Sequence, residues 1–187
     1  MQQSGCAWAF SSEKMKFYHD HKWGRPEHDD DELFAMLILE GAQAGLSWST
    51  ILDREENYRK AFDGLKPEIV AGYDAAKIKE LLLDPGIIRN RRKVASAVTN
   101  AQAFLKLQEA FGSFDRYLWG FTDGKTIDNH PKTPEEIPAE TELSKRISKD
   151  MKKRGFTFVG PTIIYAYMQS IGMVNDHLAN CPCREEG

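Results

Sequence analysis

Apolar residues recur at helical spacing over most of this 187-residue chain. They fall three or four residues apart, which places them on one side of a helix and gives them a face to bury. No segment shows the strict apolar–polar alternation that is typical of a half-buried strand. We therefore predict an all-α fold of about eight helices, and the clearest helical segments are 29–45, 54–62, 71–86, 91–112, 142–155 and 161–172.

The length is sufficient for one substantial core, so we predict that residues 1–187 form a single domain. Residues 122–140 contain three prolines and little periodicity, and we expect a surface loop there. The composition, with 41% hydrophobic and 28% charged residues, is that of an ordinary globular protein rather than a membrane protein. The N-terminus lacks the basic and apolar regions of a signal peptide, which favours the cytoplasm.

Cysteine and histidine residues gather at the two ends of the chain. The odd count of three cysteines argues against a disulfide framework. His177 and Cys181 are four residues apart, and Cys6 and His19 lie near the other terminus. Two thiolates and two imidazoles are a complete tetrahedral set for Zn²⁺. Separate histidines and inert thiols are the alternative, and two residues are rival ligands: His21 and Cys183.

A different metal site is also compatible with the N-terminal residues. His19 and His21 would lie on the same face of an extended segment, with Asp20 between them. Such a set with an open coordination position is typical of a metallohydrolase. The spacing alone does not choose between this catalytic site and a structural one.

Glu40 is a carboxylate at a position that should face the core. It follows Leu33, Met36 and Leu37 by seven, four and three residues, which puts all four on one side of the helix. A buried carboxylate needs a donor or a cationic partner, and aromatic rings favour flat cationic ligands. Nearby aromatic residues are available for such a site: Trp8, Tyr18, Trp23 and Trp48. Alternatively, Glu40 caps a neighbouring helix and the tryptophans are ordinary core residues.

Two basic segments and one short connection suggest contact with phosphate. Basic residues cluster in 89–93 and 145–154, although each cluster can also be an ordinary solvated helix face. The net charge of −3 argues against nonspecific coating of nucleic acid but allows a local basic face. Between the segments 142–154 and 161–172, Gly155 and Gly160 bound a tight connection that leaves backbone N–H groups bare at a helix start.

Several long stretches together resemble one family. They are CAW at 6–8, FYHDHKWG at 17–24, LEGAQAGLSW at 39–48, DPGIIRNRRK at 84–93, KKRGFTFVGPTIIYAYMQSIGMVNDH at 152–177, and HLANC at 177–181. They resemble the bacterial 3-methyladenine DNA glycosylase I family, a divergent branch of the helix–hairpin–helix glycosylases. The resemblance implies a helix–hairpin–helix bundle with a zinc clasp that joins residues 1–25 to residues 170–187. It places one structural Zn²⁺ on Cys6, His19, His177 and Cys181.

The resemblance also implies a role for each candidate site residue. Glu40 and Tyr18 would bind the base through hydrogen bonds, between walls formed by Trp8, Trp23 and Trp48. A further tyrosine of the family falls on Met15 here, which puts one wall in doubt. The DNA contacts would come from a wedge at residues 44–46 and a phosphate anchor at the 155–160 hairpin, and the residues expected to contribute are Gly45, Leu46, Lys153, Gly155, Gly160 and Thr162.

The implied activity is hydrolysis of the N-glycosidic bond of 3-methyladenine in alkylated double-stranded DNA. We expect a monofunctional enzyme, because no hairpin lysine is placed to form a Schiff base, and we expect a monomer. The wider superfamily has a catalytic aspartate near the position of Asp176, which here could instead orient the imidazole of His177. The competing hypothesis of another class is a zinc-stabilised DNA-binding module without catalysis.

Overall fold

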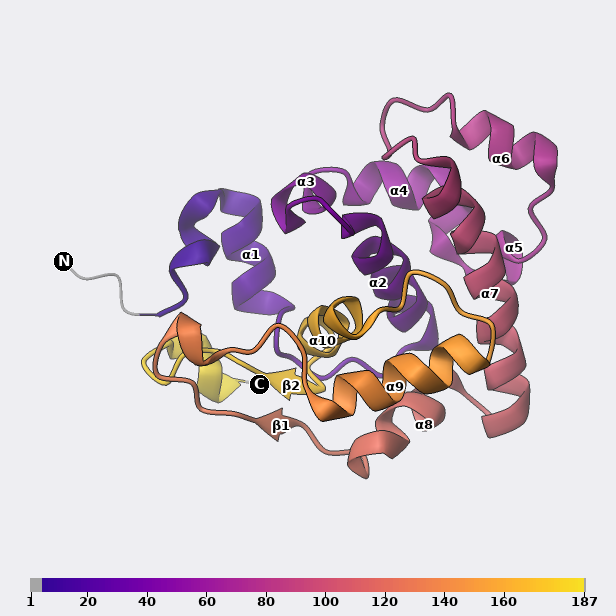
Figure 1. Ribbon diagram of the computed structural model, residues 1–187. Coiled ribbons are helices and arrows are strands. Elements are labelled where there is room, and N and C mark those ends of the chain that lie inside the picture. Colours follow the sequence, from indigo (N-terminus) through magenta and orange to yellow (C-terminus); the bar gives the residue numbers. More distant parts are fainter. Residues whose placement is uncertain (1–4, 187) are drawn as a thin grey trace.

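The computed structural model describes residues 5–186, and this part of the chain is mostly helical (Figure 1). Residues 1–4 and Gly187, which belong to the predicted terminal parts, lie outside the described residues. The α-helices are α1 (Glu13–His21), α2 (Asp30–Gln43), α3 (Trp48–Leu52), α4 (Glu55–Ala61), α5 (Pro67–Val70), α6 (Ala75–Leu81), α7 (Arg91–Phe111), α8 (Phe114–Trp119), α9 (Glu142–Lys153) and α10 (Pro161–Ser170). Short 3₁₀-helices span Ala7–Ser11, Asp63–Leu65, Gly120–Thr122, Pro134–Glu136 and Pro182–Glu186.

The helix ends follow the capping chemistry of the sequence. The Asp74 side chain accepts a hydrogen bond from the backbone N–H of Lys77 and so caps the N-terminus of α6. Asn90 caps α7 in the same way, and α7 ends at Gly112, whose φ of 86° is the left-handed conformation that favours glycine. Within residues 5–186 there are more α-helices than the eight we predicted, because short helices such as α3 and α5 lack a full period of apolar residues.

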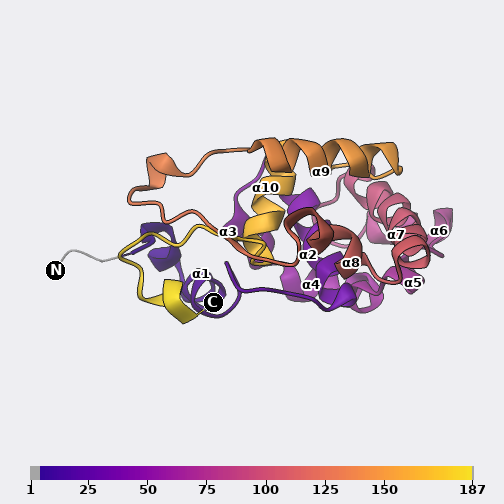
Figure 2. The same ribbon diagram turned by 90° about the horizontal axis from the view of Figure 1, so that it is seen from below.

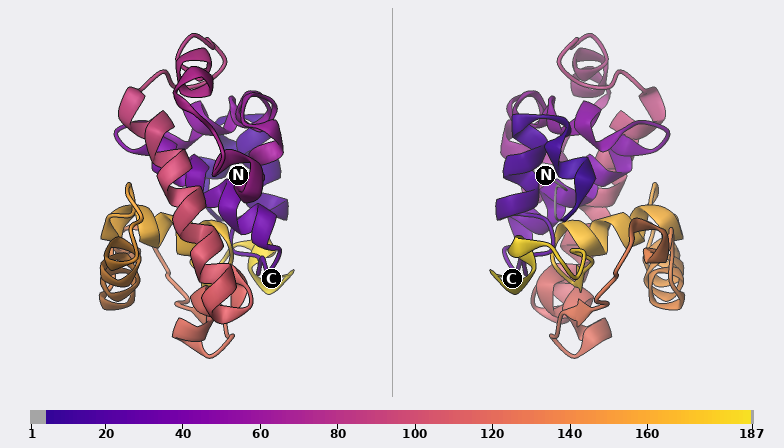
Figure 3. Two further views of the ribbon diagram at one scale, coloured as in Figure 1. Left: turned by 90° about the vertical axis from the view of Figure 1, so that its right-hand side faces the viewer. Right: turned by 90° about the vertical axis from the view of Figure 1, so that its left-hand side faces the viewer.

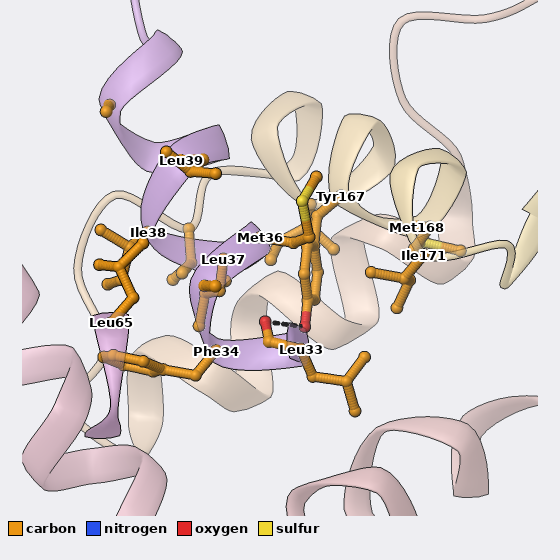
Figure 4. Packing of buried hydrophobic residues seen from close by; sticks show 14 of the residues in the cluster. Leu33, Phe34, Met36, Leu37, Ile38, Leu39, Leu65, Tyr167, Met168 and Ile171 are labelled. Carbon is orange, nitrogen blue, oxygen red and sulfur yellow. Dashed lines mark hydrogen bonds between the residues drawn. The ribbon is translucent and has the colours of Figure 1, made fainter. Parts of the chain in front are cut away.

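Helix α2 is the centre of the core (Figure 4). Every residue from 33 to 42 is buried, so this helix is enclosed on all sides rather than along one stripe. Its main neighbour is α10, where the Tyr167 hydroxyl donates a 2.7 Å hydrogen bond to the Leu33 carbonyl oxygen. The burial places Glu40, near the end of α2, inside the protein.

Helices α9 and α10 pack against each other and are joined by residues 154–160. Figure 2 shows α9 running along the outside of α10, which itself lies against α2. The α9 helix begins with a capping box in which Thr141 and Ser144 exchange side-chain to backbone hydrogen bonds. This arrangement brings the connection at 154–160 next to the C-terminal end of α2, as the contacts described below show.

The predicted loop at 122–140 contains more structure than the sequence indicated. Its strand β1 (Ile127–Asp128) pairs in parallel with β2 (Val174–Asn175), and Pro134–Glu136 forms a 3₁₀ turn. Strands of two residues are too short to show alternation, so no sequence pattern could reveal them. The pairing attaches the loop to the chain that leads into His177.

The N-terminal and C-terminal segments lie together at one end of the molecule, and α5 and α6 lie at the other (Figures 1 and 2). The right panel of Figure 3 views the molecule from the end at which the termini meet. Among the helices of residues 5–186, none has the length and apolar character needed to cross a membrane.

Candidate functional site

A cleft of about 400 Å³ opens beside Glu40, a volume that suits a small flat ligand. Its walls come from α1 and the residues after it, α2, α3, α10, the N-terminal 3₁₀-helix and the loop 122–140. The lining residues are Trp8, Met15, Tyr18, Trp23, Glu40, Gln43, Trp48, Pro134, Ile137, Ala166 and Gln169. All five residues predicted for the base pocket, namely Trp8, Tyr18, Trp23, Glu40 and Trp48, therefore border one cavity.

The Glu40 side chain is buried and only partly satisfied. It is 3% exposed, and its Oε2 atom has no hydrogen-bond partner in the described part of the chain. Burial raises the pKa of Glu40 to about 8, and the nearby Ser170 hydroxyl offsets part of this rise. A buried carboxyl oxygen without a hydrogen-bond donor destabilises the folded protein. Glu40 is therefore suited to bind a ligand that supplies such a donor.

The aromatic side chains form the sides of the cleft. Trp8 meets Trp23 edge to face, with ring centroids 5.0 Å apart, and Tyr18 lies 5.2 Å from Trp48. The Nε1 atom of Trp48 is a second buried polar atom that has no partner within residues 5–186. Burial and the adjacent Glu40 raise the pKa of Tyr18 well above its ordinary value, so its hydroxyl stays protonated and able to donate.

Met15, at the position where the sequence left one wall in doubt, is 7% exposed and lines the cleft with an apolar thioether surface rather than leaving a gap. Other lining residues were not predicted from the sequence. Pro134 and Ile137 come from the loop 122–140, in which we had expected only a surface role. Gln169 lines the cleft from α10, where the periodicity of that helix gave no indication of a functional side chain.

The four predicted metal ligands converge at the end of the molecule where the termini meet. Cys6, His19, His177 and Cys181 are buried, and their ligand atoms lie within 4.8 Å of one another. Cys181 Sγ is 3.4 Å from His19 Nε2 and 3.5 Å from His177 Nδ1. Zn–S bonds of about 2.3 Å and Zn–N bonds of about 2.0 Å separate tetrahedral S and N ligands by about 3.5 Å. The donor set and its spacing therefore fit a tetrahedral ion.

Each imidazole of this cluster is oriented through its other nitrogen. Asp20 Oδ1 lies 2.7 Å from His19 Nδ1, and the Trp23 carbonyl oxygen lies 2.9 Å from His177 Nε2. These acceptors fix the tautomers in which His19 Nε2 and His177 Nδ1 face the sulfur atoms. Burial lowers the pKa of His177 to about 4, which keeps its imidazole neutral, the form that binds metal.

Asp176 does not orient His177, which corrects that part of our interpretation. Its buried carboxylate instead accepts hydrogen bonds from Asn129 Nδ2 at 2.8 Å, Gln169 Nε2 at 2.8 Å and the Tyr165 hydroxyl at 2.6 Å. The acceptor that orients His177 is the Trp23 carbonyl, which no sequence pattern reveals. Asp176 thus connects the loop 122–140 to α10 and the cleft residue Gln169.

The alternative site with His19 and His21 is wrong. Residues 13–21 form α1 rather than an extended segment, and positions 19 and 21 point in different directions on a helix. His21 is exposed and its ring packs against Phe17, with centroids 4.6 Å apart. Cys183 lies near His19 and Asp20 as a possible ligand group, but it stands outside the tetrahedral set.

The predicted wedge and phosphate anchor lie on exposed turns. Gly45 has a φ of +78°, a conformation that favours glycine, and the Leu46 side chain that follows is 39% exposed. Gly155 likewise has a φ of +97°, and among the described residues nothing lies within 4 Å of a Cβ built on it. Lys153 and Thr162 are exposed at the two ends of the connection. These turns therefore leave backbone and side chains accessible to a partner.

The turns are neighbours in space. A Cβ placed on Gly41, near the end of α2, would lie 3.5 Å from the Cβ of Phe158 in the connection 154–160. The connection 154–160 thus packs against the end of α2, next to Glu40 and three residues before the turn at 44–46. The basic residues of α9 and Arg154 after it are exposed, at positions 145, 146, 149, 152, 153 and 154.

Comparison with known proteins identifies the family. Residues 8–185 match the methyladenine glycosylase family. The chain belongs to the methyladenine glycosylase family. The match includes the cleft, both exposed turns and three residues of the cysteine–histidine cluster, His19, His177 and Cys181, and it makes the chain an enzyme.

Individual methyladenine glycosylases are similar over nearly their whole length. The chain is 42% identical to the DNA-3-methyladenine glycosylase of Haemophilus influenzae, over 96% of this chain and 97% of that protein. It is also 42% identical to DNA-3-methyladenine glycosylase 1 of Escherichia coli, over 95% of each. The solved structure of 3-methyladenine DNA glycosylase I from Staphylococcus aureus, described for its recognition of 3-methyladenine, has a TM-score of 0.93 at 37% identity, covering 96% of this chain and 95% of that chain.

Proposed function

We propose that this protein is a monofunctional DNA glycosylase that removes 3-methyladenine from alkylated double-stranded DNA in base-excision repair. The observation that carries the proposal is Glu40, a buried carboxyl with an unpartnered oxygen in a cleft walled by aromatic rings. The similar proteins of Haemophilus influenzae and Escherichia coli bear the name of this activity. A single purine fits a cleft of about 400 Å³, whereas a base pair in a stacked duplex does not.

Recognition would depend on the altered charge of the methylated base. The N3-methylated nucleoside carries positive charge on its ring, which the faces of Trp8, Trp23 and Trp48 attract through cation–π interactions. The exocyclic amine would donate to Glu40, and the cationic ring favours the ionised carboxylate. An unmethylated adenine gains less from both contacts. A damaged base also costs less to flip out of the duplex, which adds to the selectivity.

Hydrolysis requires little chemistry from the protein. The positive base is already a good leaving group, so the bond to C1′ breaks through an oxocarbenium-like sugar that water then attacks. The bonding electron pair leaves with the base, which departs as neutral 3-methyladenine, while the water that adds to C1′ loses a proton. Glu40 and Tyr18 would hold the base in place by hydrogen bonds while this bond breaks. Because no lysine lines the described cleft, we propose that the enzyme forms no Schiff base and leaves the strand intact.

The exposed turns would hold the duplex around the flipped nucleotide. We propose that Leu46, carried by the turn at Gly45, enters the space that the base leaves. The helices α9 and α10 would act as a helix–hairpin–helix whose Gly155–Gly160 turn binds phosphate through backbone N–H groups, with Lys153 and Thr162 beside it. Their contiguity with the cleft supports this assignment, since Phe158 lies against Gly41.

We propose one structural zinc ion on Cys6, His19, His177 and Cys181. The fit is supported by the S–N separations of 3.4 and 3.5 Å and by the oriented imidazoles. Four protein ligands leave no position for an activated water, so the ion would serve stability and take no part in hydrolysis. It would join the segment that carries Trp8 and Tyr18 to the segment after α10. The single domain, the monomeric state and the cytoplasmic location remain predictions.

The decisive experiment is incubation with methylated duplex DNA, followed by identification of any released base. We expect free 3-methyladenine, with greatly reduced release by Glu40→Gln and full release by Glu109→Gln, an exposed glutamate of α7. Duplex binding without base release would instead support the noncatalytic DNA-binding module. Unchanged release by Glu40→Gln would refute the role given to that residue.

A further inference from the structure

Lys93 stands out in the basic segment 89–93 because its charge is directed into the protein. Its Nζ atom donates hydrogen bonds to the carbonyl oxygens of Ala42 at 2.8 Å and Ala44 at 2.6 Å. The side chain is partly buried, whereas Arg89, Arg91 and Arg92 are exposed. Lys93 is therefore unavailable as an ordinary solvated lysine, in contrast to our first interpretation of the segment as a basic face.

The two carbonyls belong to the end of α2 and the turn after it. A helix leaves its last four carbonyls without intrahelical partners. At the end of α2 the carbonyl of Gly41 accepts from the Ala44 N–H and that of Gln43 accepts from the Leu46 N–H, at 3.3 and 2.6 Å. The Ala42 carbonyl accepts from Lys93 instead. The ammonium group also lies at the negative end of the α2 dipole, where a cation is favoured.

The N-terminal half of α7 also holds the hairpin at 155–160. Asn100 clamps Thr157 through two hydrogen bonds, donating from Nδ2 to its carbonyl at 2.9 Å and accepting its backbone N–H at 2.8 Å. The guanidinium of Arg92 lies 6.0 Å from the centre of the Phe158 ring. The N-terminal half of α7 thus contacts both exposed elements that we assign to DNA, although none of its residues lines the cleft.

We propose that Lys93 is a positioning residue that holds the Gly45–Leu46 turn in a fixed place relative to the 155–160 hairpin. At its tip the turn has no packing partner, since among the described residues nothing lies within 4 Å of a Cβ placed on Gly45. Without the hydrogen bonds from Lys93, Leu46 would have to be ordered each time a duplex binds. The conformational entropy lost in this step would make the state with the flipped base less favourable. This inference rests on the proposed function and adds a residue to it.

The test compares Lys93→Met with Lys106→Met, which removes an exposed lysine farther along the same helix. Methionine keeps an unbranched chain but has no N–H donors. We expect Lys93→Met to slow single-turnover release of 3-methyladenine from duplex DNA about tenfold, the size typical for loss of a charged donor. Binding of free 3-methyladenine, measured by tryptophan fluorescence, should stay within about twofold of the unmutated protein, because Lys93 lies outside the cleft.

Leu46→Ala supplies a second readout. If Lys93 acts through Leu46, the double variant should be no slower than the slower single variant, whereas independent roles would multiply the two losses. Multiplied losses, undiminished release by Lys93→Met, or an equal loss of free-base binding would each overturn the proposal. Should Lys93→Met not fold, Lys93→Gln, which loses the charge and shortens the side chain, is measured instead; slower release with unchanged binding of free 3-methyladenine supports the proposal, and unchanged release overturns it. Absence of release by the unmutated protein would refute the proposed function itself, a separate outcome.

Discussion

The buried carboxyl of Glu40 should make the stability of this protein depend on pH in a specific way. Its pKa is about 8 in the folded state against 4.5 for an ordinary glutamate. The folded state therefore binds the proton more tightly than the unfolded state. The stabilisation that results is fully present below pH 4.5 and is lost as pH rises through 8. Between pH 5 and pH 9 this one group should remove about 4 kcal/mol from the free energy of unfolding.

Glu40→Gln tests this magnitude because glutamine has nearly the same shape and does not titrate. The assay is chemical denaturation of both zinc-loaded proteins from pH 5 to pH 9. Other titrating groups, including those of the cysteine–histidine cluster, contribute equally to both proteins and cancel in the difference. We expect the variant to gain about 4 kcal/mol relative to the original protein over this range, equivalent to about 8–16 °C in Tm. A difference that stays constant with pH would refute the burial argument.

Three further predictions follow from the cleft and the cluster. If the ionised form of Glu40 binds the cationic base, kcat/KM for 3-methyladenine release should rise with pH, reach half its maximum near pH 8 and level off above it. Cys181→Ser, or removal of metal with a chelator, should lower the Tm measured by calorimetry by about 6 °C or more. The control Cys183→Ser, outside the tetrahedral set, should change Tm much less. Asp176→Asn should lower the free energy of unfolding, measured in urea, by about 1–3 kcal/mol, because an amide N–H₂ would face donors such as Tyr165 and Gln169. It should also raise KM, because Gln169 would hold the wall of the cleft less firmly.

The sequence predicted those parts of the site that are carried by regular helices or by distinctive residue types. Helical spacing placed Glu40 on the inward side of α2, and the structure confirms its burial. Residue chemistry selected Cys6, His19, His177 and Cys181, and their ligand atoms converge. The resemblance to a family was needed to choose these four over His21 and Cys183, since spacing alone left the choice open.

The remaining parts of the site depend on contacts between residues far apart in the chain. Lys93 binds carbonyls about fifty residues earlier, and a lysine in a basic run carries no local sign of this. The Trp23 carbonyl orients His177 across the space between the two termini, and backbone groups have no sequence signature. Pro134 and Ile137 reach the cleft because β1 pairs with β2, a contact too short to produce a periodic pattern.

The position of the site at the end of α2 explains how one helix can serve stability and recognition together. Residues 33–39 are fully occupied with packing, which fixes the axis of the helix within the core. Glu40 is the first position at which that packing leaves a polar atom without a partner, and the turn that carries Leu46 begins a few residues later. A rigid helix therefore sets the distance between the carboxyl that would hold the base and the side chain that would replace it in the duplex. Lys93 then extends that rigidity past the last helical residue, Gln43, where the helix itself can no longer supply it.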